Sequence, residues 1–202
     1  MIIDHIGKVF FPDMALFRIV GRIAFPIYCY LLVRGANHTR NIKFYFFKVL
    51  LLGLISQPIF SYLFNTIQLN ICFSLALSIL TLKIVLSDKY KITVKVVVVI
   101  LSCITSMILG FEYNAYGIIM VLLFSIKKIP ILILSQLIWN VISIYVFSFS
   151  VYQIFAMLGI ILCIVIGNKK KDNLYKIIPK GFNYMIYPIH LLVLLIIKIN
   201  LR

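Results

Sequence analysis

Long apolar runs separated by short polar links dominate the pattern along this chain. Eight such runs can be bounded, and a partial one precedes them at residues 1–12. The eight lie at 14–33, 44–64, 69–86, 94–110, 115–126, 129–149, 151–167 and 182–199. A helix perpendicular to a bilayer needs about 20 residues, so the shortest run, 115–126, is expected to be tilted or re-entrant. The pattern predicts an all-α fold: one domain over 1–202, forming a polytopic transmembrane helical bundle of about eight spans plus a partial amino-terminal segment.

The basic residues alternate between links, and this alternation predicts a topology. They cluster after the first, third, fifth and seventh runs: Arg34, Arg40, Lys43 and Lys48; Lys83, Lys89, Lys91 and Lys95; Lys127 and Lys128; and five lysines within 169–180. The links 65–68, 111–114 and 148–150 contain no Lys or Arg. Because basic loops stay in the cytoplasm, the basic links are expected inside, and both termini and 111–114 outside.

Composition agrees with a membrane protein. Hydrophobic residues make up 63% of the chain, charged residues only 12%, and the mean hydropathy is +1.12. The net charge of +15 would suggest a nucleic-acid partner in a soluble protein. Here it follows from the basic flanks of the spans, so the expected partner is the lipid bilayer and not nucleic acid.

No metal site or disulfide framework is expected. The four cysteines stand singly inside apolar runs, and no CxxC pair occurs. The sequence also lacks GxSxG, P-loop and HExxH motifs, so any chemistry must come from polar residues within the membrane.

Two arginines stand out in the first full run. Arg18 and Arg22 are one helical turn apart and lie about 6 and 12 Å from its outer end. Arginine at such depth is costly unless it is paired or hydrated, although Arg18 can also snorkel outward. Asp4, Asp13 and Glu112 are the candidate partners.

The three histidines differ in their surroundings. His190 lies about 12 Å into the last run, two residues after Pro188, whose missing N–H frees a backbone carbonyl. His5 follows Asp4 near the outer interface, and either histidine can act as a general base. The alternatives are a hydrogen-bonded packing role for His190 and no role for His5. His38 lies in a basic link, where it is solvated unless that link binds a ligand.

Four amides also fall at membrane depth, at Gln57, Asn70, Gln136 and Asn140. Gln136 and Asn140 share a helical face. Hydrogen bonding between helices is the expected role of all four.

A series of short motifs resembles the TraX family over essentially the whole chain. DHIG at 4–7 is similar to the signature that opens the family, and GRIAFPIY at 21–28 resembles its GRxAFPxF element. Gly35, His38, Thr39 and Asn41 resemble a further segment. The match continues in order at 54–58, 69–75, 112–117 and 187–191. The family usually has an apolar half-helix before the Asp-His pair, and its absence here suggests a start codon assigned too late or a shortened chain.

The resemblance implies an acetyltransferase of a bacterial cytoplasmic (inner) membrane. The namesake acts in conjugation and acetylates the amino terminus of a membrane-inserted pilin subunit, with acetyl-CoA as the expected donor. The catalytic candidates are the polar residues in matched motifs: His190, His5, Asp4, Arg22 and Glu112. Arg34, His38, Arg40 and Lys43 form the candidate site for the phosphates of acetyl-CoA.

From these residues we expect His190 and Arg22 to share one site, with Asp4 or Glu112 supplying negative charge. The basic link would hold the donor while its thioester reaches into the bundle.

Two other functions stay open. One is O-acetylation of a cell-envelope glycan instead of a pilin amine. The other is transport of a small anion, which usually requires inverted repeats that this sequence does not display.

Overall fold

The computed structural model describes residues 1–168 and 182–201. These residues form helices: α1 (Ile2–Phe10), α2 (Ala15–His38), α3 (Ile42–Phe64), α4 (Ile71–Val85), α5 (Ile92–Ile108), α6 (Asn114–Leu123), α7 (Ile129–Val146), the 3₁₀ helix η1 (Val151–Phe155), α8 (Ala156–Asn168) and α10 (Phe182–Asn200). Leu69 and Phe111 form an isolated parallel bridge, and no strand occurs in the described residues. The predicted all-α class is therefore confirmed.

Each predicted apolar run contains a helix, but the number of membrane crossings stays a prediction. Three helices, α2, α3 and α7, are long and apolar enough to cross a membrane. Five further apolar segments are shorter, at Ile71–Val85, Ile92–Ile108, Asn114–Leu123, Val151–Val165 and Met185–Asn200. The basic link 169–180 lies outside the described residues.

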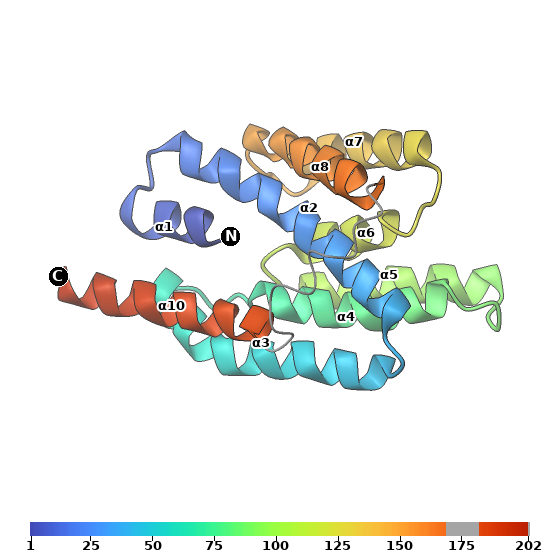
Figure 1. Ribbon diagram of the computed structural model, residues 1–202, viewed down its shortest axis with the longest axis horizontal. Helices are drawn as coiled ribbons and strands as arrows, with labels where there is room; N and C mark the ends of the chain where they lie inside the picture. Colours follow the sequence, from blue (N-terminus) through green and yellow to red (C-terminus); the bar gives the residue numbers. More distant parts are fainter. Residues whose placement is uncertain (169–181, 202) are drawn as a thin grey trace.

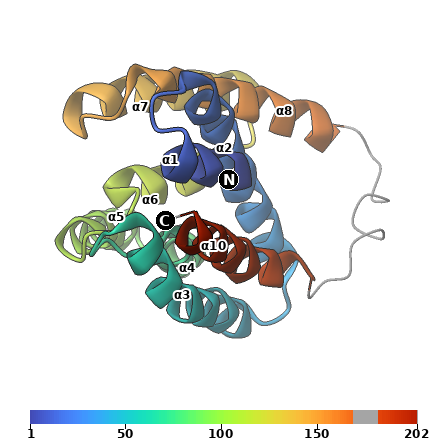
Figure 2. The same ribbon diagram turned by 90° about the vertical axis from the view of Figure 1, so that its left-hand side faces the viewer.

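Helix α2 crosses the middle of the molecule and connects its two sides. In Figures 1 and 2, α7 and α8 lie on one side, while α3, α4, α5 and α10 lie on the other, with α6 between them. Helix α2 packs against α8, α1, α6 and α4, and α3 packs against α4 and α10. Residues from both sides therefore meet along α2.

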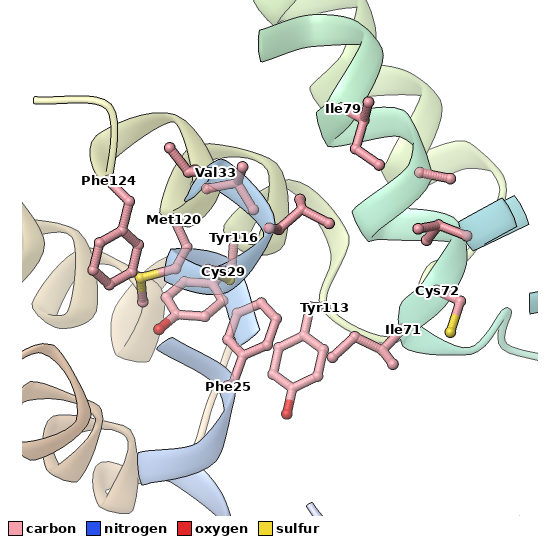
Figure 3. Close-up of a cluster of buried hydrophobic side chains, with 14 of the residues drawn as sticks. Phe25, Cys29, Val33, Ile71, Cys72, Ile79, Tyr113, Tyr116, Met120 and Phe124 are labelled. Atoms are coloured by element: carbon pink, nitrogen blue, oxygen red, sulfur yellow. The ribbon is translucent and has the colours of Figure 1, made fainter. Parts of the chain in front are cut away.

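The centre of the molecule is an apolar and aromatic core. The Phe25 and Tyr113 rings stack with centroids 4.1 Å apart, and Cys29, Tyr116 and Met120 lie beside them (Figure 3). This core joins α2 to α6 and fixes the start of α6 next to the middle of α2.

Asparagines mark several helix ends. The side chains of Asn41 and Asn70 accept hydrogen bonds from the backbone N–H groups of Phe44 and Cys72, which caps α3 and α4 at their first turns. Asn65 ends α3 with a left-handed φ of 47°, and Gly110 follows α5 with φ of 64°. The ends at Asn65 and Gly110 lie between helices that pack against each other, α3 with α4 and α5 with α6.

Many large apolar side chains face outward. On α3, Leu51, Leu54 and Ile55 are exposed, and α5 and α7 carry similar rows. Monomeric soluble proteins rarely expose apolar surface on this scale, whereas a lipid-facing helix does. Together with the apolar helices, this surface supports a membrane protein.

The amides form hydrogen bonds between helices, as predicted. Asn70 donates to Gln57 Oε1 and to the Gly53 carbonyl, both 2.9 Å away, which joins α3 to the start of α4. The Tyr116 hydroxyl donates to Asn140 Oδ1 at 3.0 Å, and Gln136 donates to the Met120 carbonyl at 3.4 Å. These bonds join α6 to α7.

Candidate functional site

The short helix α1 carries three buried residues into the bundle: Asp4, His5 and Gly7. It packs against α2, α3 and α10. Glycines make this approach possible, because a Cβ on Gly21 of α2 would overlap the Asp4 side chain, and one on Gly7 would overlap Phe17. The DHIG and GRxAFPxF motifs are thus the two sides of one helix contact.

Two histidines from opposite ends of the chain meet at this contact. His5 Nδ1 lies 2.8 Å from His190 Nε2 across 185 residues of sequence. The rings are tilted by only 18° and their centroids are 5.1 Å apart. Nearly parallel rings with such close nitrogens must meet edge to edge, which is the geometry of a hydrogen bond between them.

The second nitrogen of His190 is also bonded. His190 Nδ1 lies 2.8 Å from the Ile186 carbonyl oxygen, one turn earlier in α10. His5 and His190 are only 3% and 7% exposed, so both rings are held in place inside the bundle.

A charged cluster of Lys8 and Asp4 on α1 and Glu112 before α6 lies next to the histidine pair. Lys8 Nζ lies 2.9 Å from Glu112 Oε1 and 3.5 Å from Asp4 Oδ2. The second oxygen of Asp4, Oδ1, is buried and has no partner among the described residues. This cluster joins α1 to the link before α6.

Lys8 is the residue that sequence reasoning missed as a partner for the two carboxylates. Arg22 was the expected partner, but the described structure contains no ion pair between Arg22 and either Asp4 or Glu112. The reason is local: Lys8 stands one helical turn after Asp4, so the two side chains share a face of α1. The spacing of four residues between Asp4 and Lys8 is the sequence feature that predicts this pair.

Arg22 lies close to the cluster without bonding to its carboxylates. Its Nε is buried and has no partner in the part of the chain that the structure describes. Arg22, Lys8 and Glu112 all lie within electrostatic range of the buried Tyr113 hydroxyl. No hydrogen bond joins Arg22 to His190 among the described residues, and the expectation that the two residues share one site stays a prediction.

A small cavity of about 20 Å³ opens between these groups. Asp4, His5, Gly21, Glu112 and Tyr113 are among its lining residues. The volume suffices for about one water molecule. Four of the predicted site positions, Asp4, His5, Glu112 and His190, are therefore at this cavity or bonded to a residue that lines it.

The remaining candidates lie elsewhere. Asp13 is exposed in the link between α1 and α2, and Arg18 is half-buried in the first turns of α2. Arg34 and His38 lie in the last turns of α2, and Arg40 and Lys43 follow at the start of α3. His38, Arg40 and Lys43 are exposed. Arg34 is about 18 Å along the helix axis from Arg22, so the candidate residues for binding acetyl-CoA form a group separate from the cavity.

Fold and site together define an all-α, membrane-type protein with a buried histidine pair and an ion cluster at one helix contact. The model of the TraX family, described as TraX protein, matches residues 1–198. The chain belongs to this family.

Two curated proteins are similar to parts of the chain. A probable fimbrial assembly protein FimC, serogroup H1, from Dichelobacter nodosus is 33% identical over 100 residues, covering 42% of this chain and 41% of that protein. An uncharacterized protein of Rickettsia prowazekii (strain Madrid E) is 50% identical over 30 residues, covering 15% of this chain and 12% of that protein. The chain therefore aligns with less than half the length of either relative. No solved structure matches the chain.

Proposed function

We propose that this protein is a membrane-embedded acetyltransferase of a bacterial cytoplasmic membrane. It moves an acetyl group from cytoplasmic acetyl-CoA to the amino terminus of a pilin subunit. The observation that carries the proposal is the buried His5–His190 pair beside a cavity lined by carboxylates. The TraX family is associated with pilin acetylation, and one relative is named as a fimbrial assembly protein, which supports a role in pilus assembly.

The chemistry of acetyl transfer suits the groups at the site. An amine nitrogen must lose a proton as it bonds to the thioester carbonyl carbon, and a histidine is the usual general base for such a step. Negative charge develops on the carbonyl oxygen, and the cations Arg22 and Lys8 are the nearby groups able to stabilise it. The ion pairs of Lys8 with Asp4 and Glu112 hold one of these cations in place.

The cavity has room for little more than water, so substrate binding requires it to widen. Helix α1 forms one wall and is only nine residues long, so a shift of this short helix is the movement by which the cavity would widen. The acceptor would enter at this wall, and the donor thioester would approach along α2 from the basic link.

Turnover of acetyl-CoA by the purified protein tests the proposal. Thiol release should require a peptide with the free amino terminus of a pilin, and mass spectrometry should find one added acetyl group on that amine. A matched peptide with a blocked amino terminus is the control. Acetylation of a glycan in place of the peptide would favour the O-acetyltransferase, and no thiol release with either acceptor would contradict the proposal.

A further inference from the structure

The hydrogen bonds of the histidine pair determine where its protons lie. The Ile186 carbonyl oxygen can only accept, so His190 Nδ1, 2.8 Å away, must carry a proton. A neutral imidazole has one N–H, so His190 Nε2 then has a lone pair and accepts the proton of His5 Nδ1. Both rings are buried, which favours their neutral forms.

The same reasoning leaves one basic nitrogen in the pair. With its proton on Nδ1, neutral His5 has its lone pair on Nε2. No hydrogen bond to this atom occurs within residues 1–168 and 182–201, and His5 lines the cavity beside Asp4 and Glu112. Both nitrogens of His190 are occupied, by Ile186 and by His5.

We infer that His5 is the general base and that His190 is a positioning residue that holds the His5 ring and its tautomer through the Ile186 carbonyl. This inference rests on the proposed acetyl transfer. The acceptor amine nitrogen bonds to the acetyl carbon, its proton passes to His5 Nε2, and the C–S bond breaks. The thiolate of coenzyme A then takes the proton from His5, which restores the neutral base.

Amide substitutions separate the two roles, because Gln places its oxygen near the position of a histidine Nε2, and Asn near that of Nδ1. His190→Gln keeps an acceptor for His5 Nδ1, so its rate of acetyl transfer should stay within about tenfold of the wild-type rate. His5→Gln removes the base, so its rate should fall by about 10²–10⁴-fold. The matched variant His190→Asn lacks the acceptor and should fall well below His190→Gln. The opposite pattern, an active His5→Asn and an inactive His190→Gln, would overturn the assignment.

A spectroscopic measurement tests the proton positions without any turnover. In ¹⁵N-histidine-labelled protein, His5 and His190 should both carry their proton on Nδ1, and the exposed His38 serves as the internal reference. A proton on Nε2 of His190 would contradict the inference, because this nitrogen could not then accept the proton of His5 Nδ1. Wild-type protein with the expected tautomers but no acetyl transfer would instead contradict the proposed function, so the two failures are distinguishable.

Discussion

Lys8 is the cation on which both site carboxylates depend. Its side chain contacts Glu112 and Asp4, and all three side chains are largely buried. A buried charge that loses its partner is costly, since the interior cannot replace the lost solvation. Lys8 therefore contributes to the stability of the folded protein as well as to the charge of the site.

Replacing Lys8 by Met should lower the free energy of unfolding by about 3–5 kcal/mol, because two carboxylates are left without their cation. Thermal unfolding in detergent would measure the loss. Lys198→Met is the matched control, because Lys198 Nζ donates to a neutral acceptor, the Leu63 carbonyl, at 2.6 Å and has no ion pair within the described residues. Its loss should be smaller, about 1 kcal/mol.

Adding Asp4→Asn and Glu112→Gln to Lys8→Met should recover most of this stability, since the carboxylates are then neutral. A Lys8→Met protein as stable as the wild type would contradict the role of this ion cluster.

Sequence reasoning identified the residues of the site better than their pairings. The cost of burying charge singled out Asp4, Glu112, His5 and His190, and the structure brings these four to one contact. The partner of each residue depends on how helices distant in sequence are rotated against one another. Periodicity within one helix does not contain that information, and for this reason the His5–His190 bond was not predicted.

At the scale of elements, helix α1 is held against α2 by close contacts at Gly7 of α1 and Gly21 of α2. Neither Gly7 nor Gly21 has room for a Cβ, and the obstacle at Gly21 is the Asp4 carboxylate itself. A substitution there acts on the position of α1 and hence on His5.

Gly21→Ala should destabilise the protein by about 1–3 kcal/mol, the usual cost of overpacking, and should displace α1. Gly167→Ala is the control, because Gly167 is also helical and the nearest described atom to its Cβ would be the hydroxyl oxygen at the end of the Tyr30 side chain. Thermal unfolding and the ¹⁵N signals of His5 would be compared in both variants. An unchanged His5 spectrum in Gly21→Ala would show that the α1–α2 contact does not position the base.

The helices themselves were predictable because long apolar runs leave few alternatives in lipid. The run at 129–149 became α7, and 44–64 became α3, to within a few residues. The run at 151–167 differs, since it begins as the 3₁₀ turn η1 before α8. There, Ser150 caps the Tyr152 backbone N–H and the buried Gln153 donates to the Tyr116 hydroxyl. Tertiary hydrogen bonds of this kind are not visible in hydropathy.

For the whole molecule, the alternation of basic links predicts which loops lie on which side of the membrane. Single cysteines at Ile67 and at Lys128, both exposed, would test it in a variant without the four native cysteines. An impermeant maleimide added to spheroplasts should label Ile67→Cys, and should label Lys128→Cys only after the membrane is opened. The reverse pattern would contradict the predicted orientation.

The basic residues around the α2–α3 link lie apart from the cavity, and this separation leads to a prediction about the binding of acetyl-CoA. Neutralising Arg34, Arg40 and Lys43 together should raise the KM for acetyl-CoA, and more so at low salt, because phosphate contacts are electrostatic. Neutralising Lys89, Lys91 and Lys95 removes the same charge from another link and is the control. If both triple variants change the KM for acetyl-CoA equally, Arg34, Arg40 and Lys43 are basic residues that flank the predicted spans and do not bind the donor.

The short helices have a consequence for the lipids around the protein. Helix α4 has 15 residues and α6 has ten, which corresponds to about 22 and 15 Å, against about 30 Å of hydrocarbon in a typical bilayer. Where a helix this short crosses the membrane and faces lipid, the adjacent bilayer thins to match it, at a cost in elastic energy that grows with each ångström of mismatch. We therefore expect the bilayer to thin wherever a predicted crossing of this length meets lipid, which would bring the cytoplasmic and external water layers closer together there.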